Sequence, residues 1–160
     1  MTGGGPTGGG RSGSGPRAPF RMLFVCTGNS ARSQLAEGLA NHLGDGRVEA
    51  QSAGTMPFGV SSHAVEVMRE RGIDIVRQYS KGLDDVVGPF DLVITLCDSA
   101  VRECPRSLFE APHRHWSTPD PSFVAGGPEA VHASFRLVRD RLEAQILALI
   151  EEVRPGEPAF

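Results

Sequence analysis

Eight residues near the start of the chain combine a nucleophile with groups that bind an anion. They form the segment Cys26, Thr27, Gly28, Asn29, Ser30, Ala31, Arg32 and Ser33. The planar guanidinium of an arginine binds two oxygens of a tetrahedral anion at once, which a lysine cannot do. A cysteine thiolate is a strong nucleophile toward the central atom of such an anion. The segment therefore predicts a site where Arg32 holds a tetrahedral oxyanion and Cys26 attacks it.

The residues on either side of this segment place it between a strand and a helix. Met22–Val25 is a short apolar run that is typical of a buried strand. After the segment, apolar residues recur at a spacing of four and then end at a glycine: Leu35, Leu39, Leu43 and Gly44. The N-terminus of a helix attracts anions because its N–H groups are unpaired and its dipole end is positive. We therefore expect Cys26 to be a thiolate at neutral pH.

The loop residues have several expected roles. Those expected to bind the oxyanion are Thr27, Gly28, Asn29, Ser30, Ala31 and Arg32. Gly28 lets the backbone come close, Ser33 is placed to donate a hydrogen bond to the thiolate, and Asn29 is suited to fixing the loop through side-chain-to-backbone bonds. The alternative is a buried cysteine at a strand end with an unrelated surface arginine. The strand–loop–helix context favours the anion site.

The rest of the chain predicts an α/β fold: a four-stranded parallel sheet with helices on both faces. Further strands are expected at 48–52, 91–97 and 113–117, and further helices at 62–71 and from Pro128 to about Leu149. Strands that alternate with helices are joined by right-handed crossovers, which place helices on the two faces of the sheet. Ligands of such sheets bind beyond the carboxyl ends of the strands. Cys26 and Cys97 each close a strand and Asp120 follows another, so we expect all three at one edge.

Length and composition indicate one folded domain with two tails. The chain of 160 residues is long enough for one core and too short for two comfortable ones. Residues 1–20 hold eight of the 20 glycines and three of the 12 prolines, so we expect a flexible Gly-rich tail there. A single catalytic domain is expected at 21–153, followed by a C-terminal tail at 154–160.

Charge, hydropathy and cysteine content exclude several classes of protein. The formal net charge of -3 argues against a general nucleic-acid binder. No run approaches the roughly 20 apolar residues of a membrane span, and the start of the chain lacks the apolar core of a signal peptide. Three cysteines are an odd number, which favours free thiols over a disulfide framework. We expect a soluble, cytoplasmic, monomeric protein.

The segment from Val25 to Gly38 resembles the active-site loop that low-molecular-weight protein tyrosine phosphatases share with thioredoxin-coupled arsenate reductases. The similarity continues through Gln51–Gly54, Val93–Cys97, Cys104-Pro105, His115-Trp116 and Asp120-Pro121. It covers nearly all of residues 21–153. Because the resemblance implies the same phosphatase-like fold for both families, the fold does not choose between them.

The reductase resemblance implies a relay of three cysteines. Cys26 attacks arsenate bound in the loop, Cys97 then attacks the sulfur of Cys26 and expels arsenite, and Cys104 attacks Cys97 and regenerates Cys26. The oxidised pair passes to thioredoxin, and no cofactor is needed because two thiols supply two electrons. Sulfur exchange requires alpha carbons within roughly 7 Å, so we expect the polar residues 98–103 to form a loop that moves. The alternatives are a small apolar residue ending a strand at 97 and a chance loop cysteine at 104.

A phosphatase would use the nucleophile, the arginine and an acid, and would have no use for Cys97 or Cys104. In both reactions the resemblance makes Asp120 the general acid that protonates the leaving group. The alternative is a solvated aspartate that begins a turn. The phosphatase family usually has aromatic residues just after its Asp-Pro pair, whereas here Ser122 follows, with Phe123 next. This departure favours the reductase.

Two positions depart from the family pattern. Ala31 replaces a cysteine that is frequent at that place and that the relay does not use. One reductase branch holds a potassium ion beside the loop, and three of its ligand positions match: Asn29, Glu37 and Ser52. The expected aspartate falls near Gly82, next to Lys81. We hypothesise that the ammonium of Lys81 stands in for the ion.

Two other classes of function were weighed against catalysis at the loop. Zinc could in principle take two sulfurs and two nitrogens from Cys97, Cys104, His113 and His115. These residues lack the short Cys-x-x-Cys spacing of most such sites, so we expect no metal there. A non-enzymatic anion sensor is conceivable, but no residue favours it over catalysis.

Overall fold

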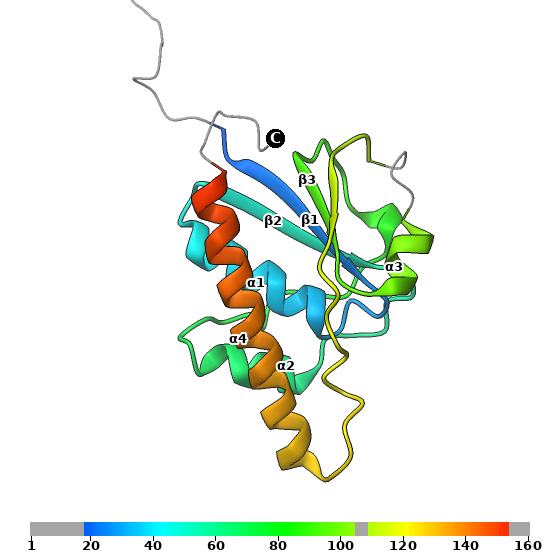
Figure 1. The fold of residues 1–160 in the computed structure, drawn as a ribbon, viewed down its shortest axis with the longest axis vertical. Helices are drawn as coiled ribbons and strands as arrows, with labels where there is room; N and C mark the ends of the chain where they lie inside the picture. The colour runs from blue at the N-terminus through cyan, green and yellow to red at the C-terminus, as the bar shows by residue number, and fades with distance from the viewer. Residues whose placement is uncertain (1–17, 105–108, 154–160) are drawn as a thin grey trace, which may run out of the picture.

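Four strands form one parallel sheet in the computed structural model, which describes residues 18–104 and 109–153. They are β1 (Phe20–Cys26), β2 (Val48–Gly54), β3 (Leu92–Thr95) and β4 (His113–His115). Their order is β2-β1-β3-β4, and each neighbouring pair is parallel (Figure 1). The predicted fold class is confirmed. β1 begins one residue before the expected domain boundary at 21, and residues 1–17 and 154–160 of the predicted tails lie outside the described residues.

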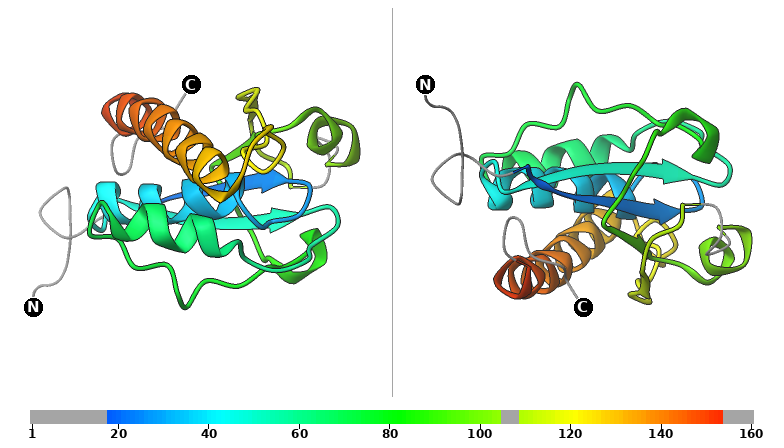
Figure 2. Two further views of the ribbon diagram at one scale, coloured as in Figure 1. Left: turned by 90° about the horizontal axis from the view of Figure 1, so that it is seen from below. Right: turned by 90° about the horizontal axis from the view of Figure 1, so that it is seen from above.

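Helices cover both faces of the sheet, as predicted. They are α1 (Arg32–Gly44), α2 (Ser62–Arg69), α3 (Asp98–Glu103) and α4 (Pro128–Glu152), with a short 3-10 turn η2 (Leu83–Asp85). Figure 1 shows α1 and α2 next to α4, and both views in Figure 2 show the strands pointing toward the end where α3 lies. None of the helices within the described residues is long and apolar enough to cross a membrane.

The alternation of β1 explains how one strand serves two cores. Met22 and Phe24 point to the face covered by α1, α2 and α4, and both are fully buried. Leu23 and Val25 point to the opposite face, where they pack with Ala100 of α3 and other apolar residues. Successive strand residues face opposite ways, so a continuous apolar run is what a strand buried on both faces requires. The apolar run therefore forms an inner strand of the sheet, between β2 and β3.

Helix α3 stands where the sequence predicted a loop, so that prediction is wrong. The strand before it ends at Thr95, and Cys97 and Cys104 flank the helix as its N-cap and C-cap residues. Ala100 and Cys104 are four residues apart and are both buried in the core on the α3 face of the sheet. Their burial gives this polar segment an apolar side. The two later cysteines are therefore held at opposite ends of a formed helix.

Glu70 at the end of α2 joins this helix to α4. Its carboxylate accepts hydrogen bonds from Arg136 Nη2 at 2.7 Å and from Arg139 Nη1 at 2.7 Å. The bonds from Arg136 and then from Arg139 lower the pKa of Glu70 to about 2. Arg139 is itself almost fully buried and also donates to the carbonyl of Val67. The packing of α2 on α4 is therefore fixed by ionised side chains as well as by apolar contact.

Candidate active site

A cavity of about 400 Å³ opens at the carboxyl ends of β1 and β3. Its lining residues come from the loop after β1, from the segment after β2, from the end of β3 and from the loop after β4: Cys26, Thr27, Gly28, Ser30, Ala31, Arg32, Phe58, Cys97, Asp120, Ser122 and Phe123. Asn29 and Ser33 are fully buried behind it. Cys104 does not line the cavity. The structure thus brings together most of the residues that the sequence singled out.

The nucleophile candidate Cys26 lies at the end of a chain of hydrogen bonds. Ser33 Oγ is 2.8 Å from Cys26 Sγ. The side-chain amide of Asn29 donates to Ser33 Oγ at 2.7 Å and to Ser52 Oγ at 2.9 Å. Because the oxygen of Ser33 already accepts from Asn29, its hydroxyl hydrogen is free to point at the sulfur. This arrangement lets Ser33 donate a hydrogen bond to the sulfur of Cys26.

Asn29 fixes the loop more firmly than its sequence position suggested. Its φ of 46° lies in the left-handed region, which asparagine tolerates better than most residues. Its carbonyl accepts bonds from Ser80 Oγ at 2.6 Å and from Gln34 Nε2 at 3.0 Å. Its side-chain oxygen accepts the N–H of Lys81 at 2.9 Å. These bonds run from α1 and from the segment after α2, so the loop is held before any anion arrives.

Arg32 begins α1, and its guanidinium is oriented by the loop after β4. Nη1 donates to the carbonyl of Thr118 at 3.1 Å, and Nη2 lies 3.6 Å from Asp120 Oδ2. The side chain of Arg32 is only 11% exposed, and that of Asp120 is 27% exposed. The two contacts leave the guanidinium facing the cavity beside a carboxyl group. An anion held by Arg32 would therefore lie within reach of a proton donor.

Cys97 lies across the cavity and carries hydrogen bonds of its own. Thr27 Oγ1 is 3.3 Å and Ser99 Oγ is 3.4 Å from Cys97 Sγ. Burial raises the pKa of the Cys97 thiol, whereas bonds from Ser99, Thr27 and the backbone of Ala100 lower it. The charge of Arg32 lowers it further, and the net result is a pKa below that of an ordinary thiol. Cys97 is therefore more readily ionised than a free cysteine.

Cys104 is placed differently from the other two cysteines. It is 2% exposed, it packs in the core on the α3 face, and burial raises the pKa of its thiol. With α3 formed, its alpha carbon is about 10 Å from that of Cys97, since seven residues rise by 1.5 Å each. A disulfide needs the two alpha carbons within roughly 7 Å. All three thiols are free, and Cys104 can reach Cys97 only if α3 unwinds.

Two aromatic residues at the cavity mouth complete the site, and sequence reasoning missed one of them. Phe58 and Phe123 both line the cavity although they are 76% and 85% exposed. The N–H of Phe58 donates to the carbonyl of Gly28 at 3.1 Å, and a Cβ at position 28 would collide with the Phe58 ring at 2.1 Å. Gly28 thus admits a ring above the loop. The available signal for Phe58 was its position just after β2, at the edge where the other site residues lie.

The ammonium of Lys81 lies beside Glu37, one of the three residues that match potassium ligand positions. Its ammonium lies 3.5 Å from Glu37 Oε1 and 3.4 Å from the carbonyl of Tyr79. Glu37 also accepts a hydrogen bond from Ser52, which connects this pair to Asn29 and the loop. The side chain of Lys81 is 8% exposed. These residues do not fit a potassium ion, because a cation from the protein already pairs with the carboxylate.

The zinc alternative is not supported within the described residues. Cys97 and Cys104 lie at opposite ends of α3, and His115 Nε2 lies 3.3 Å from Asp98 Oδ1. Across 18–104 and 109–153, the side chains whose ligand atoms converge are a different group, His63, Glu66 and His132. The four residues suggested by the sequence therefore form no ligand set.

Known proteins similar to this chain include arsenate reductases and phosphatases. A curated arsenate reductase from Bacillus licheniformis is 44% identical over 132 residues, covering 81% of this chain and 94% of that protein. A solved arsenate reductase in its phosphate-binding state gives a TM-score of 0.72 at 31% identity, over 84% of this chain and 98% of that one. A low molecular weight protein tyrosine phosphatase from T. tengcongensis gives 0.68 at 31% identity, over 84% and 99%. The family model of the low molecular weight phosphotyrosine protein phosphatases matches residues 21–157, and the chain belongs to that family.

Proposed function

We propose that this chain reduces arsenate to arsenite through a relay of Cys26, Cys97 and Cys104, and that thioredoxin restores the thiols. The observation that carries the proposal is the second thiol at the anion cavity. Cys97 shares that cavity with Cys26 and Arg32, and its pKa is lowered there. Hydrolysis of a phosphoester has no use for such a thiol, whereas a two-electron reduction requires one. The arsenate reductases among its relatives support the same reaction.

The first step forms a bond between sulfur and arsenic. Arsenate is held by Arg32 and by the N–H groups of the loop at the start of α1. The thiolate of Cys26 attacks arsenic, and one oxygen leaves as water after Asp120 has supplied a proton. The 3.6 Å contact between Asp120 and Arg32 supports this role. The product is a covalent adduct in which arsenic is still pentavalent.

The second and third steps move the oxidation to sulfur. The thiolate of Cys97 attacks the sulfur of Cys26, the sulfur–arsenic bond breaks, and its electron pair reduces arsenic to arsenite. A disulfide now joins Cys26 and Cys97. The thiolate of Cys104 then attacks Cys97, releases Cys26 as a thiolate and forms a second disulfide. Two electrons from a thioredoxin dithiol reduce that disulfide, a step that suits the reducing cytoplasm expected from the sequence.

Helix α3 has to open during this cycle. Cys104 is buried with a raised pKa, and it stands a full helix away from Cys97. Formation of the Cys26–Cys97 disulfide engages the N-cap residue of α3. The six residues of α3 can then unwind, because a helix this short has little stability of its own. Unwinding exposes Cys104, removes the burial that raises its pKa, and brings the two sulfurs together. The expected movement of residues 98–103 thus becomes a helix-to-loop change.

The coupled assay is arsenate-dependent consumption of NADPH through thioredoxin reductase and thioredoxin. We expect sustained turnover for the unaltered chain. Cys104→Ser should lower the steady-state rate to background, because the Cys26–Cys97 disulfide cannot be passed on. The same variant should still form one equivalent of arsenite per protein molecule in a single turnover. An unchanged steady-state rate in Cys104→Ser would contradict the relay.

A low-molecular-weight phosphatase is the second candidate, and the aromatic residues at the mouth favour it. Phe58 and Phe123 flank the opening over Cys26 and could hold the ring of an aryl phosphate. Such a reaction would pass through a phosphoenzyme at Cys26, with Asp120 protonating the leaving alcohol. Hydrolysis of a small aryl phosphate, measured in parallel, separates the candidates. A phosphatase without reductase function would turn over the aryl phosphate and consume no NADPH with arsenate.

The cation at Lys81 makes a separate prediction about monovalent ions. If its ammonium supports the loop through Glu37, activity should be equal in potassium and in sodium at matched ionic strength. Lys81→Ala removes this cation and leaves the partly buried carboxylate of Glu37 without it, so we expect a lower kcat/KM that potassium partly restores. Initial rates in the two salts check both statements. A severalfold gain from potassium in the unaltered chain would show that Lys81 does not replace the ion.

A further inference from the structure

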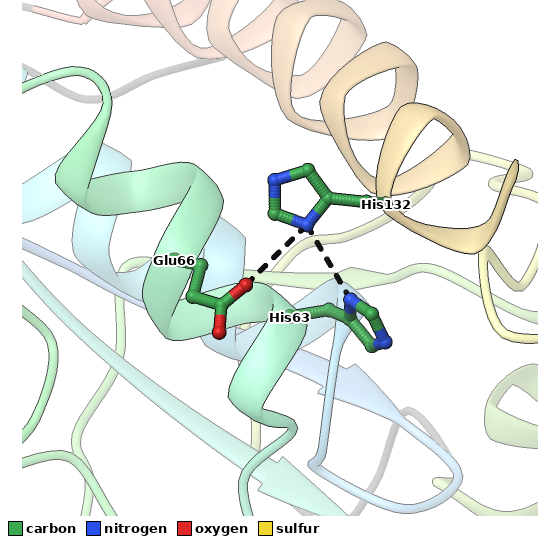
Figure 3. A group of neighbouring side chains, drawn as sticks. All are labelled: His63, Glu66 and His132. Carbon is green, nitrogen blue, oxygen red and sulfur yellow. Dashed lines mark hydrogen bonds and ion pairs between the residues drawn. The ribbon is translucent and has the colours of Figure 1, made fainter. Parts of the chain in front are cut away.

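Two packed helices each present an imidazole to a space outside the cavity of Cys26. His63 lies in the first turn of α2, and His132 lies in the second turn of α4. Their Nδ1 atoms are 3.4 Å apart (Figure 3). Glu66, three residues after His63 on the same helix face, places Oε1 at 3.6 Å from His132 Nδ1. The ligand atoms of the three residues all lie within 4.8 Å of one another.

These distances match the spacing of ligands around one metal ion. Zinc binds imidazole nitrogen and carboxylate oxygen at about 2.0–2.2 Å, so neighbouring ligands of a tetrahedral ion lie about 3.3–3.5 Å apart. The distance from His132 Nδ1 to His63 Nδ1, 3.4 Å, is in that range, and the distance to Glu66 Oε1, 3.6 Å, is just above it. The remaining one, between His63 and Glu66, can close because the Glu66 side chain is 58% exposed and free to rotate. Little rearrangement is needed to form the ligand set.

The surroundings hold both imidazoles in position. His132 Nε2 lies 3.4 Å from Glu70 Oε2, and Arg136 and Arg139 fix that carboxylate. A carboxylate on the far nitrogen of a metal-binding histidine sets its tautomer and orients the ring, leaving the near nitrogen as a ligand. The ring of His63 packs against the buried Phe135, with centroids 5.2 Å apart. Both ligand nitrogens are therefore positioned by contacts other than those they make with each other.

The site also has room and charge for a dication with a bound water. It lies in an open cavity of about 470 Å³, whose lining residues are His63, Glu66, Pro128, Glu129, His132 and Arg136. The charge of Arg136 is balanced by its hydrogen bonds to Glu70. Glu66 and Glu129 then leave the cavity with negative charge. Two imidazoles and one carboxylate suit zinc and similar transition metals, whereas calcium and magnesium prefer sites made of oxygen ligands.

We propose that His63, Glu66 and His132 bind a divalent transition-metal ion of the zinc class, with water as a fourth ligand. The ion would join α2 to α4. Its influence would extend to the loop of Cys26, because Ser61, the N-cap residue of α2, donates its N–H to the carbonyl of Ser30 at 2.9 Å. The role is structural: the ion stabilises the packing of α2, and it takes no part in the sulfur chemistry. The proposal does not depend on the proposed function.

The test compares zinc binding by the reduced full-length chain with binding by three variants. His132→Gln and Glu66→Gln each remove one ligand, and His42→Gln removes an exposed histidine of α1 as the matched control. We expect calorimetric titration and metal analysis after dialysis to show one zinc equivalent fewer in His132→Gln, weaker binding in Glu66→Gln, and no change in His42→Gln. The thiols also bind zinc, but they are common to all four proteins. The differences therefore report on the helix site alone.

Thermal unfolding gives a second measure. At zinc concentrations about 100 times the dissociation constant, the unaltered chain and His42→Gln should gain about 5–10 °C in Tm relative to the two ligand variants. Magnesium at the same concentration should give no such difference. Glu66 is exposed, so Glu66→Gln decides the matter if His132→Gln does not fold. Equal zinc stoichiometry and affinity in the unaltered chain and in Glu66→Gln would overturn the proposal.

Discussion

Replacing Cys97 with serine should abolish arsenate reduction and leave the hydrolysis of a small aryl phosphate largely intact, whereas Cys26→Ser should abolish both reactions. The reason is the different use of the two sulfurs. Cys26 forms the covalent bond in either reaction, but Cys97 is needed only for the reduction, in which the two sulfurs form a disulfide and arsenic gains two electrons. A serine at 97 keeps the hydrogen bonds with Thr27 and Ser99 and cannot form a disulfide. The measurements are arsenite formed per protein molecule and initial rates with the aryl phosphate.

Hydrolysis within about an order of magnitude of the unaltered rate is the control that Cys97→Ser has kept its cavity. Ser99→Ala is a matched variant on the same side of the cavity, since it removes a hydrogen-bond partner of Cys97 without removing its sulfur. We expect Ser99→Ala to slow reduction and to leave it measurable. Arsenite production by Cys97→Ser at the unaltered steady-state rate would contradict the relay. Loss of both reactions in Cys97→Ser would instead mean that the residue supports the cavity.

The strand, the loop and the first helix could be predicted because local sequence determines them. The apolar run of β1, the small polar residues and the four-residue spacing of α1 lie within 25 consecutive residues. Cys26 and Ser33 are in contact across seven positions, so no distant element has to be placed to bring them together. The shared edge for Cys97 and Asp120 followed from the parallel connections alone. The order of strands and helices along the chain was therefore enough to predict the edge of the sheet at which the cavity lies.

Features that depend on how helices pack could not be predicted in the same way. His63 and His132 are 69 positions apart, and their contact requires α2 to lie on α4 in one register. Periodicity gives the apolar face of each helix but not which polar residues meet at its border. The six residues of α3 are too few for a repeating pattern to be distinguished from a polar loop. Phe58 was missed because an exposed aromatic residue in a loop carries no periodic signal.

Arg32→Lys should lower kcat/KM by about 10²–10³ for both arsenate and the aryl phosphate, which is the loss expected for removing a donor that faces developing negative charge. The guanidinium makes two contacts and also faces the cavity. It donates to the carbonyl of Thr118, lies beside Asp120 and presents the rest of its planar fork to the cavity. An ammonium at the end of a flexible chain cannot hold two anion oxygens and keep both neighbours. Steady-state kinetics with each substrate measure the loss.

The matched control is Arg141→Lys, because Arg141 also binds the loop after β4 and does so from outside the cavity of Cys26. Its guanidinium donates to the carbonyl of Ser117 at 2.8 Å, next to the carbonyl that Arg32 uses. If Arg32 acted only by holding Thr118 and Asp120 in place, Arg32→Lys and Arg141→Lys would lose activity to the same extent. If the anion binds the fork of Arg32, only Arg32→Lys loses activity by orders of magnitude, and inorganic phosphate loses its power to inhibit that variant. Equal, small losses in both variants would place the anion elsewhere and would remove the reason for Cys26 to be the nucleophile.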